Sequence, residues 1–182
     1  MSSTFRYFAY GSNLLKERIH INNPSAEFIG VALLKNYKLA FGNCKRVLQH
    51  HKSNSHWGDG GVATILKSEG DNVWGSVWKI NMDHMAALDS QEGVSERYYD
   101  PLEVVVHTLD NDELVCRTYQ QTECELCDPT PQYLSVVQDG AKQSGLPNTY
   151  LSFLMSIKHN NYQGESSIYQ QVQEKKLDGL KE

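Results

Sequence analysis

The sequence predicts an α+β fold, a closed or strongly curved, mainly antiparallel β-sheet with helices on one side. Short runs rich in β-branched and aromatic residues fill the first two-thirds of the 182-residue chain. The last third changes to helical patterns with recognisable start and stop residues. Because no internal repeat is present, we expect one domain over residues 1–165, followed by a polar helix or tail over 166–182.

The first two-thirds of the chain contain the expected strands. They are residues 5–10, 27–42, 61–66, 73–80, 102–107 and 114–119. The run 27–42 is either two short strands or one bent strand. Turn residues at 69–72 predict a break between two strands, and those at 110–112 predict a hairpin. Asn81 is expected to cap a short helix over residues 82–90.

The last third begins with a strong helix signal. Thr130 followed by Pro131 is a cap and a first-turn proline, and Gly145 is the matching stop. A second, shorter helix is expected after Pro147. Residues 43–60 show no clear period and contain several histidines and basic residues, which predicts a long surface loop.

Composition and charge exclude several classes of protein. With 17 Lys and Arg against 22 Asp and Glu, the net charge of −5 argues against a nucleic-acid binder. We see no signal-peptide pattern and no apolar run of membrane-spanning length, so no membrane partner is expected. Four cysteines are sparse for a secreted scaffold and favour an intracellular protein with reduced thiols. They are Cys44, Cys116, Cys124 and Cys127.

The most informative segment is residues 5–13, where an aromatic-rich strand runs into Gly11-Ser12-Asn13 and then directly into a helical run. Consecutive backbone N–H groups at such a turn can bind an anion. Gly11 lets the backbone approach a ligand closely, because it has no Cβ. Ser12 and Asn13 can either cap the helix or bind the ligand. The alternative is an ordinary strand-to-helix turn.

Glu92 is the candidate catalytic acid or base. It stands at the end of the expected short helix, immediately before Gly93. The partial negative charge at a helix C-terminus should raise its pKa. A glutamate with a raised pKa can act as a general base near neutral pH. The alternative is a surface acid in a loop.

Two other residue types need an interpretation. Among ten tyrosines, several on expected strands or at a helix start can either pack in the core or line one polar pocket.

Cys124 and Cys127 have the spacing of a metal or redox pair, but a second such pair is missing and His159 is too distant in sequence to complete it. We therefore expect no metal, with a zinc protein as the alternative.

The order and spacing of seven short segments resemble the γ-glutamylcyclotransferase family. The likeness runs from about residue 5 to about residue 165, and each segment alone is short. The segments are 8–14 (Phe-Ala-Tyr-Gly-Ser-Asn-Leu), 23–26 (Asn-Pro-Ser-Ala), 41–43 (Phe-Gly-Asn), 73–75 (Val-Trp-Gly), 88–94 (Leu-Asp-Ser-Gln-Glu-Gly-Val), 116–119 (Cys-Arg-Thr-Tyr) and 131–133 (Pro-Gln-Tyr).

This resemblance implies a cytoplasmic homodimer with a small mixed β-barrel flanked by helices. It implies cleavage of γ-glutamyl amino acids to 5-oxoproline and a free amino acid, without metal or cofactor. The family's catalytic glutamate falls on Glu92. Its substrate-binding positions fall on Tyr7, Phe8, Ala9, Tyr10, Gly11, Ser12, Asn13, Tyr99, Tyr119 and Tyr133.

The sequence departs from the family pattern in the 43–60 loop and at Glu96-Arg97-Tyr98, and both could reshape the pocket rim. Three alternatives therefore stay open. The substrate can be a γ-glutamylamine or glutathione instead of a γ-glutamyl amino acid. The chain can also be a non-catalytic binding protein on the same fold.

Overall fold

The computed structural model of this chain describes residues 3–44, 56–121 and 123–179. Its strands are β1 (Thr4–Ala9), β2 (Glu27–Cys44), β3 (Val62–Asn81), β4 (Tyr99–Thr108), β5 (Glu113–Gln121) and β6 (Cys124–Leu126). Its helices are α1 (Lys16–Asn22), α3 (Met85–Gln91), α4 (Pro131–Ser144), α5 (Asn148–Ser156) and α6 (Ser167–Gly179), with 3₁₀ turns η1 (Ser12–Leu14) and η2 (Met82–His84).

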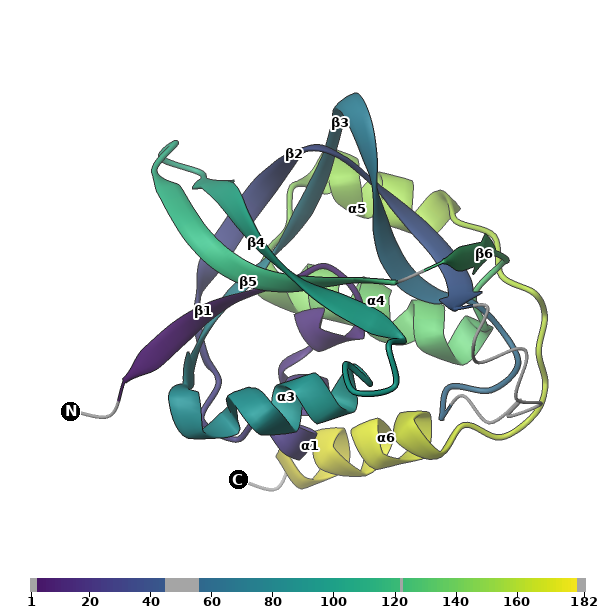
Figure 1. The fold of residues 1–182 in the computed structure, drawn as a ribbon. Helices are drawn as coiled ribbons and strands as arrows, with labels where there is room; N and C mark the ends of the chain where they lie inside the picture. Colours follow the sequence, from purple (N-terminus) through teal and green to yellow (C-terminus); the bar gives the residue numbers. More distant parts are fainter. Residues whose placement is uncertain (1–2, 45–55, 122, 180–182) are drawn as a thin grey trace.

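Five strands close into a barrel in the order β3-β1-β5-β4-β2, because β2 also pairs with β3 (Figure 1). The short strand β6 adds to the edge of β2. β1 runs parallel to β5, whereas the remaining pairs in the described part of the chain are antiparallel. The predicted α+β fold with a mixed, mainly antiparallel barrel is confirmed.

β2 and β3 are long, bent partners rather than sets of short strands. The bent-strand interpretation of 27–42 is confirmed, whereas the expected break at 69–72 is wrong. The register between the two strands shifts between Lys35 and Tyr37. At this irregularity Gly70 has a φ of 83° and donates its N–H to Asn36 Oδ1 at 3.1 Å. Turn-forming residues here bend a continuous strand, because pairing resumes on both sides.

The predicted boundaries of α4 are confirmed by its cap contacts. Thr130 Oγ1 accepts a hydrogen bond from the backbone N–H of Tyr133 at 3.1 Å, and Gly145 ends the helix with a φ of 73°. The expected short helix after Asn81 is also present, but it begins as η2 and the Asn81 side chain makes no capping bond. Most of the expected loop, residues 45–55, lies outside the described residues.

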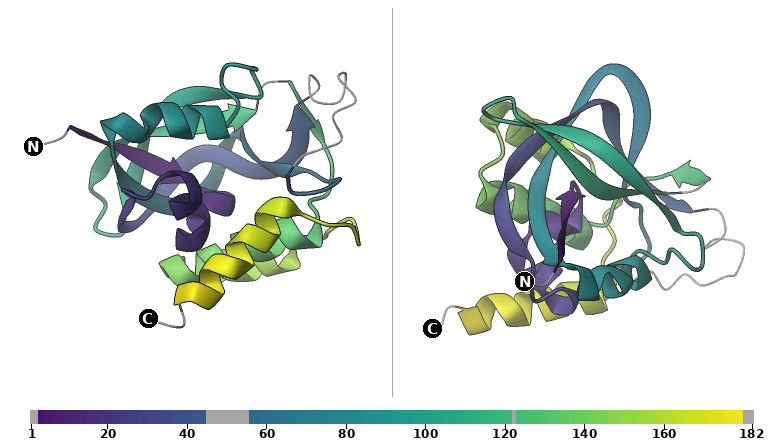
Figure 2. Two further views of the ribbon diagram at one scale, coloured as in Figure 1. Left: turned by 90° about the horizontal axis from the view of Figure 1, so that it is seen from below. Right: turned by 60° about the vertical axis from the view of Figure 1, so that its left-hand side comes forward.

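The helices cover the back and the lower end of the barrel rather than one face of an open sheet. In Figure 1, α4 and α5 lie behind the strands, and α1, α3 and α6 lie below them. The view from below in Figure 2 places α3 and α6 on different sides of α1. Val172 of α6 is fully buried and belongs to the same core cluster as Phe8 of β1. This C-terminal helix therefore packs against the core that the barrel and the other helices share.

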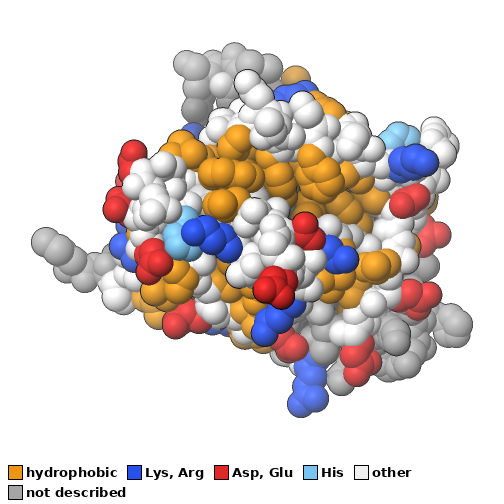
Figure 3. Space-filling view, turned by 90° about the horizontal axis from the view of Figure 1, so that it is seen from above, with side chains coloured by type: hydrophobic (Ala, Val, Ile, Leu, Met, Phe, Trp, Pro, Cys, Tyr) orange, Lys and Arg blue, Asp and Glu red, His pale blue; other side chains and the backbone are white. Residues whose placement is uncertain are grey.

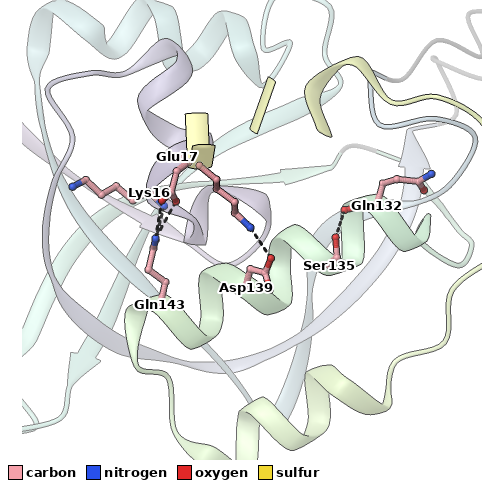
Figure 4. Close-up of polar contacts among 7 residues, drawn as sticks. Lys16, Glu17, Gln132, Ser135, Asp139 and Gln143 are labelled. Atoms are coloured by element: carbon pink, nitrogen blue, oxygen red, sulfur yellow. Dashed lines mark hydrogen bonds and ion pairs between the residues drawn. The ribbon is translucent and has the colours of Figure 1, made fainter. Parts of the chain in front are cut away.

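Polar contacts join α4 to its neighbours α1 and α6 (Figure 4). Gln143 donates to the Glu17 carboxylate at 2.9 Å and accepts from the backbone N–H of Lys16 at 2.8 Å. Asp139 pairs with Lys176 at 2.7 Å. Because Lys16 and Glu17 form the first turn of α1, these contacts hold the segment that leads out of the 11–15 loop.

Gly140 of α4 gives a stability prediction in which packing opposes helix propensity. A Cβ at this position would overlap the backbone N of Leu15 and lie 2.7 Å from Leu14 Cβ. Gly140→Ala should therefore lower the free energy of unfolding by about 1–3 kcal/mol through overpacking, although propensity alone favours alanine by about 1 kcal/mol. Denaturant unfolding measures the change.

The matched control is Gly179→Ala in α6, where an added Cβ meets nothing within 4 Å. We expect this variant to change the free energy of unfolding by no more than about 1 kcal/mol. A stabilised Gly140→Ala variant would contradict the close approach of α4 to η1.

Within the described residues, no helix has both the length and the apolar character needed to cross a membrane.

Candidate active site

The loop after β1 differs from the predicted direct passage into a helix. Ser12, Asn13 and Leu14 form the 3₁₀ turn η1, and Leu15 is extended with a φ of −83° and a ψ of 127°. The expectation that the helix begins at residue 14 is therefore wrong, and α1 starts at Lys16. Neither η1 nor α1 has a side-chain cap, which leaves the largely buried Ser12 and Asn13 side chains for other contacts.

A small cavity of about 40 Å³ lies against this loop. It is lined by Tyr7, Tyr10, Gly11, Ser12, Asn13, Ala63, Glu92, Tyr99, Tyr119 and Tyr133. All of these except Ala63 are positions that the sequence singled out. The two remaining predicted positions, Phe8 and Ala9, are fully buried in the core and do not line the cavity. Side chains alternate along β1, so Tyr7 and Phe8 cannot both face the same side.

Glu92 is held in the cavity wall by two neutral amide donors. Asn13 Nδ2 donates to Glu92 Oε1 at 3.3 Å, and Gln91 Nε2 donates to the same oxygen at 3.2 Å. Gln91 also donates to Asn13 Oδ1 at 3.3 Å, so the two amides position each other. Among the described residues Glu92 Oε2 makes no hydrogen bond, so it is the oxygen that can accept a proton.

Burial raises the pKa of Glu92 from 4.5 to about 7. The positive charge of Arg18 and the hydrogen bond from Gln91 oppose this shift, and the charge of Asp89 adds to it. The direction agrees with the sequence prediction, but the largest cause is desolvation rather than the end of α3. A carboxyl group with this pKa is half ionised near neutral pH, which suits a general base.

Three of the cavity tyrosines donate their hydroxyl protons to acceptors within the protein. Tyr10 donates to the backbone oxygen of Tyr119 at 2.5 Å, and Tyr99 donates to the backbone oxygen of Ala63 at 2.7 Å. Tyr119 donates to Asp89 Oδ1 at 2.5 Å. These hydroxyl groups therefore shape the cavity wall and are already committed as donors.

The other two cavity tyrosines keep their protons available. Tyr133 Oη accepts the backbone N–H of Ala63 at 2.9 Å, and Tyr7 Oη accepts Asn13 Nδ2 at 3.1 Å. Neither hydroxyl donates to an acceptor among the described residues. Burial raises the pKa of Tyr133 to about 12, so the group stays protonated at neutral pH. Tyr7 and Tyr133 can therefore both donate a hydrogen bond to a ligand in the cavity.

A salt bridge that the sequence reasoning missed supports this wall. Arg117 binds Asp89 through both carboxylate oxygens, at 2.7 and 2.9 Å, and its Nε donates to Tyr119 Oη at 3.0 Å. Bidentate pairs of this kind fix orientation as well as charge. Asp89 lies on α3, one turn before Glu92, which directly follows the helix, so the pair ties the end of α3 next to Glu92 to strand β5.

A larger groove of about 560 Å³ adjoins the cavity and shares Ser12, Glu92, Tyr99 and Tyr133 with it. Sequence reasoning assigned no role to several residues of its wall. They include Arg18, Asn22, His56, Trp57 and Gln91. Only Gln91 had a local signal, its position beside Glu92. The others reach the groove from α1 and from the segment before β3, a placement that no local pattern indicates.

Metal ligation has no candidate cluster in the described ranges. There is no group of three or more His, Cys, Asp or Glu side chains there that could hold a metal ion. The four cysteines are free thiols. Cys124 stands opposite Cys44 in the β2–β6 pairing, and Cys127 Sγ accepts a hydrogen bond from Asn43 at 3.5 Å.

Sequence comparison identifies the family of this chain. Residues 72–154 match the AIG2-like family. The chain is 50% identical over 164 residues to gamma-glutamylcyclotransferase from Bos taurus, covering 90% of this chain and 84% of the relative. It is 48% identical to the protein of the same name from Homo sapiens, with the same coverage.

Structural comparison gives the same result. A solved structure named gamma-glutamyl cyclotransferase superposes with a TM-score of 0.87 at 45% identity, covering 94% of this chain and 99% of the other. The chain that forms this barrel and the cavity beside Glu92 is thus about 50% identical to its relative from Bos taurus over 90% of its length. This chain therefore belongs to the γ-glutamylcyclotransferase family and is an enzyme of that type.

Proposed function

We propose that this chain converts γ-glutamyl amino acids to 5-oxoproline and a free amino acid by intramolecular aminolysis. The observation that supports this most directly is Glu92, whose pKa is raised to about 7 at a cavity bordered by the Gly11–Ser12 backbone. The reaction needs a base and a rigid pocket but no protein nucleophile. On this proposal the enzyme is a cofactor-independent lyase that acts in γ-glutamyl and glutathione metabolism.

Glu92 is the proposed base. The α-amine of the substrate is mostly protonated at neutral pH, since its pKa is about 8. Glu92 Oε2 removes one proton, and the neutral amine nitrogen then bonds to the γ-carbonyl carbon, which closes a five-membered ring with an oxyanion and a ring nitrogen that still carries two hydrogens. The protonated Glu92 gives its proton to the leaving nitrogen as the original amide C–N bond breaks and the carbonyl re-forms. Glu92 then takes the second proton from the ring nitrogen and passes it to the released amine, so the products are the neutral lactam and an amino acid with a protonated amine.

The loop after β1 has the second role, which is to hold the glutamyl group in a reactive conformation. The backbone around Gly11 and Ser12 is the proposed site for its α-carboxylate, and the hydroxyl groups of Tyr7 and Tyr133 can donate to it or to the γ-carbonyl oxygen. Positioning of this kind contributes about 7–11 kcal/mol to catalysis in favourable cases. A donor aimed at the developing oxyanion adds to it.

The pH dependence of kcat/KM should reveal Glu92. Because only the ionised carboxylate accepts a proton, activity is retained above pH 7 and lost as pH falls through the raised pKa of about 7. For the wild type we expect the acid side of the pH profile to have an apparent pKa near 7. In Asn13→Ala this apparent pKa should be higher, because the Asn13 hydrogen bond lowers the pKa of Glu92. An acid limb near the ordinary glutamate value of about 4.3 would contradict the assignment.

The experiment that tests the proposed function is an assay for 5-oxoproline with purified protein and γ-glutamyl-alanine, glutathione and ε-(γ-glutamyl)-lysine. We expect γ-glutamyl-alanine to be the best substrate. A preference for one of the other two would replace the proposed substrate class and keep the reaction. No 5-oxoproline from any of them would favour a non-catalytic binding protein on the same fold.

We further propose a cytoplasmic location and a homodimeric state. Four free thiols are compatible with a reducing compartment. Hydrophobic side chains gather across the face seen from above (Figure 3). On α5, Phe153 and Met155 are each 45% exposed. Exposed apolar patches commonly mark interfaces. Sedimentation equilibrium should give a dimer mass that falls toward the monomer in Phe153→Asp, and a monomeric wild type would contradict this.

A further inference from the structure

Arg18 is a buried cation that forms no salt bridge in the described part of the chain, although the charge of Glu92 acts on it from the same groove. Its side chain is only 5% exposed. The ion pairs there join Lys79 to Glu27, Arg117 to Asp89 and Lys176 to Asp139, and none includes Arg18. Removing a charge from water without pairing it is costly. A guanidinium that has no salt bridge to the described residues and lies in the wall of a groove is therefore a candidate site for an anionic ligand.

The few contacts that Arg18 makes with described residues leave most of its hydrogen-bonding capacity unused there. Nη1 donates to Gln91 Oε1 at 3.4 Å, which is long for a hydrogen bond, and Nε has no partner among the described residues. The guanidinium carbon lies 5.8 Å from the centre of the Trp57 ring, close enough for a cation–π contact. A fork of N–H donors backed by an aromatic ring suits a carboxylate, which it can bind through two parallel bonds.

The place of Arg18 identifies which carboxylate it can bind. It lines the larger groove together with Glu92 and Tyr133, and it does not line the small cavity. If the glutamyl group lies in the small cavity, as the proposed function requires, the leaving amino acid extends into this groove. In a γ-glutamyl amino acid, the second carboxylate is two bonds from the leaving nitrogen. That carboxylate therefore lies on the groove side of Glu92.

We propose that Arg18 forms a subsite for the free α-carboxylate of the leaving amino acid. This inference rests on the proposed function and narrows its substrate class. A γ-glutamylamine has no carboxylate at that position, and in glutathione the corresponding group is a peptide carbonyl. Arg18 thus selects γ-glutamyl amino acids from the alternatives that the sequence leaves open.

The test compares γ-glutamyl-alanine with γ-glutamyl-alaninamide, which differ only in the charge of this group. A charge-assisted hydrogen bond to a buried partner should favour the acid by roughly 10- to 100-fold in kcat/KM for the wild type. In Arg18→Gln this ratio should fall to within about threefold of unity, and in Arg18→Lys it should be intermediate, because lysine keeps the charge without the fork. Arg6→Gln, the same change on an exposed position of β1, should leave the ratio unchanged.

Calorimetric titration with the same two compounds tests the subsite without requiring turnover, because it measures their Kd values directly. The Kd ratio of acid to amide should change with Arg18 as the kcat/KM ratio does. If Arg18→Gln weakens both compounds equally, or if the wild type does not distinguish them, the subsite is refuted and Arg18 acts only through Gln91 and Glu92. If the wild type yields no 5-oxoproline but still prefers the acid in binding, the proposed function fails and the subsite stands.

Protein stability separates this role from a structural one. Because Arg18 is buried without a salt bridge to any described residue, Arg18→Gln should keep or raise Tm, as is common when a ligand-binding group is removed. A fall in Tm together with equal losses for both substrates would show that the side chain serves packing instead, and would overturn the proposal.

Discussion

Glu92→Gln is expected to reduce kcat by roughly 10²- to 10⁴-fold, the usual contribution of a general base. Glutamine fills the same space and can keep the contacts with Asn13 and Gln91, but its side chain cannot take up the substrate proton. The measurement is single-substrate kinetics with γ-glutamyl-alanine and detection of 5-oxoproline. Near-normal activity would exclude Glu92 as the base.

A second readout shows that the loss is chemical and not a failure to fold. The pKa of Glu92 is raised in the folded state, so the folded protein binds this proton more tightly than the unfolded chain. Its contribution to stability is therefore lost as pH rises from about 4.5 to about 7. Glutamine imitates the protonated form, so at pH 8 the variant should be more stable by about 1–3 kcal/mol. A destabilised variant would make the kinetic result uninterpretable.

Gly11→Val is expected to have the second largest effect, the loss of substrate binding. A Cβ at this position would lie 2.9 Å from Tyr133 Oη and 3.0 Å from Ala63 Cβ, so the two further methyl groups of valine enter the cavity. A cavity of about 40 Å³ has no room for them beside a carboxylate. We expect KM to rise by about 100-fold or more, an amount typical of a lost charged contact.

The reason is space and not backbone conformation, since Gly11 has a φ of −112°, which other residues adopt. Gly11→Ala should therefore give a smaller defect than Gly11→Val. Gly179→Val is the matched control, because nothing lies within 4 Å of a Cβ there. Calorimetric titration with 5-oxoproline completes the test, and unchanged affinity in Gly11→Val would argue against this loop as the carboxylate site.

Features whose cause lies within a few residues could be read from the sequence. The α4 boundaries follow from Thr130, Pro131 and Gly145, because capping and left-handed stops are local. The fold class follows from the order of strand and helix patterns. Even the direction of the Glu92 pKa shift was predicted, although from the end of the helix, whereas the largest cause in the structure is burial.

Features decided by long-range packing could not be read in this way. The turn signal at 69–72 predicted a break, but pairing with β2 keeps β3 continuous, because the hydrogen bonds on both sides outweigh a local preference. The same holds for the tyrosines. Sequence could not say which hydroxyl protons are free, because Tyr99 and Tyr133 both bond to Ala63, 36 and 70 residues away.

The sequence by itself therefore determined the fold class and the family resemblance, and that resemblance implied nearly the whole lining of the small cavity. The tertiary structure decided what these groups can do. It withdraws Glu92 from water between Asn13 and Gln91, and it places Arg18 in the adjoining groove without a salt bridge to any described residue. Chemistry at this site depends on burial and on partners distant in the chain, and those are properties of the closed barrel rather than of any segment.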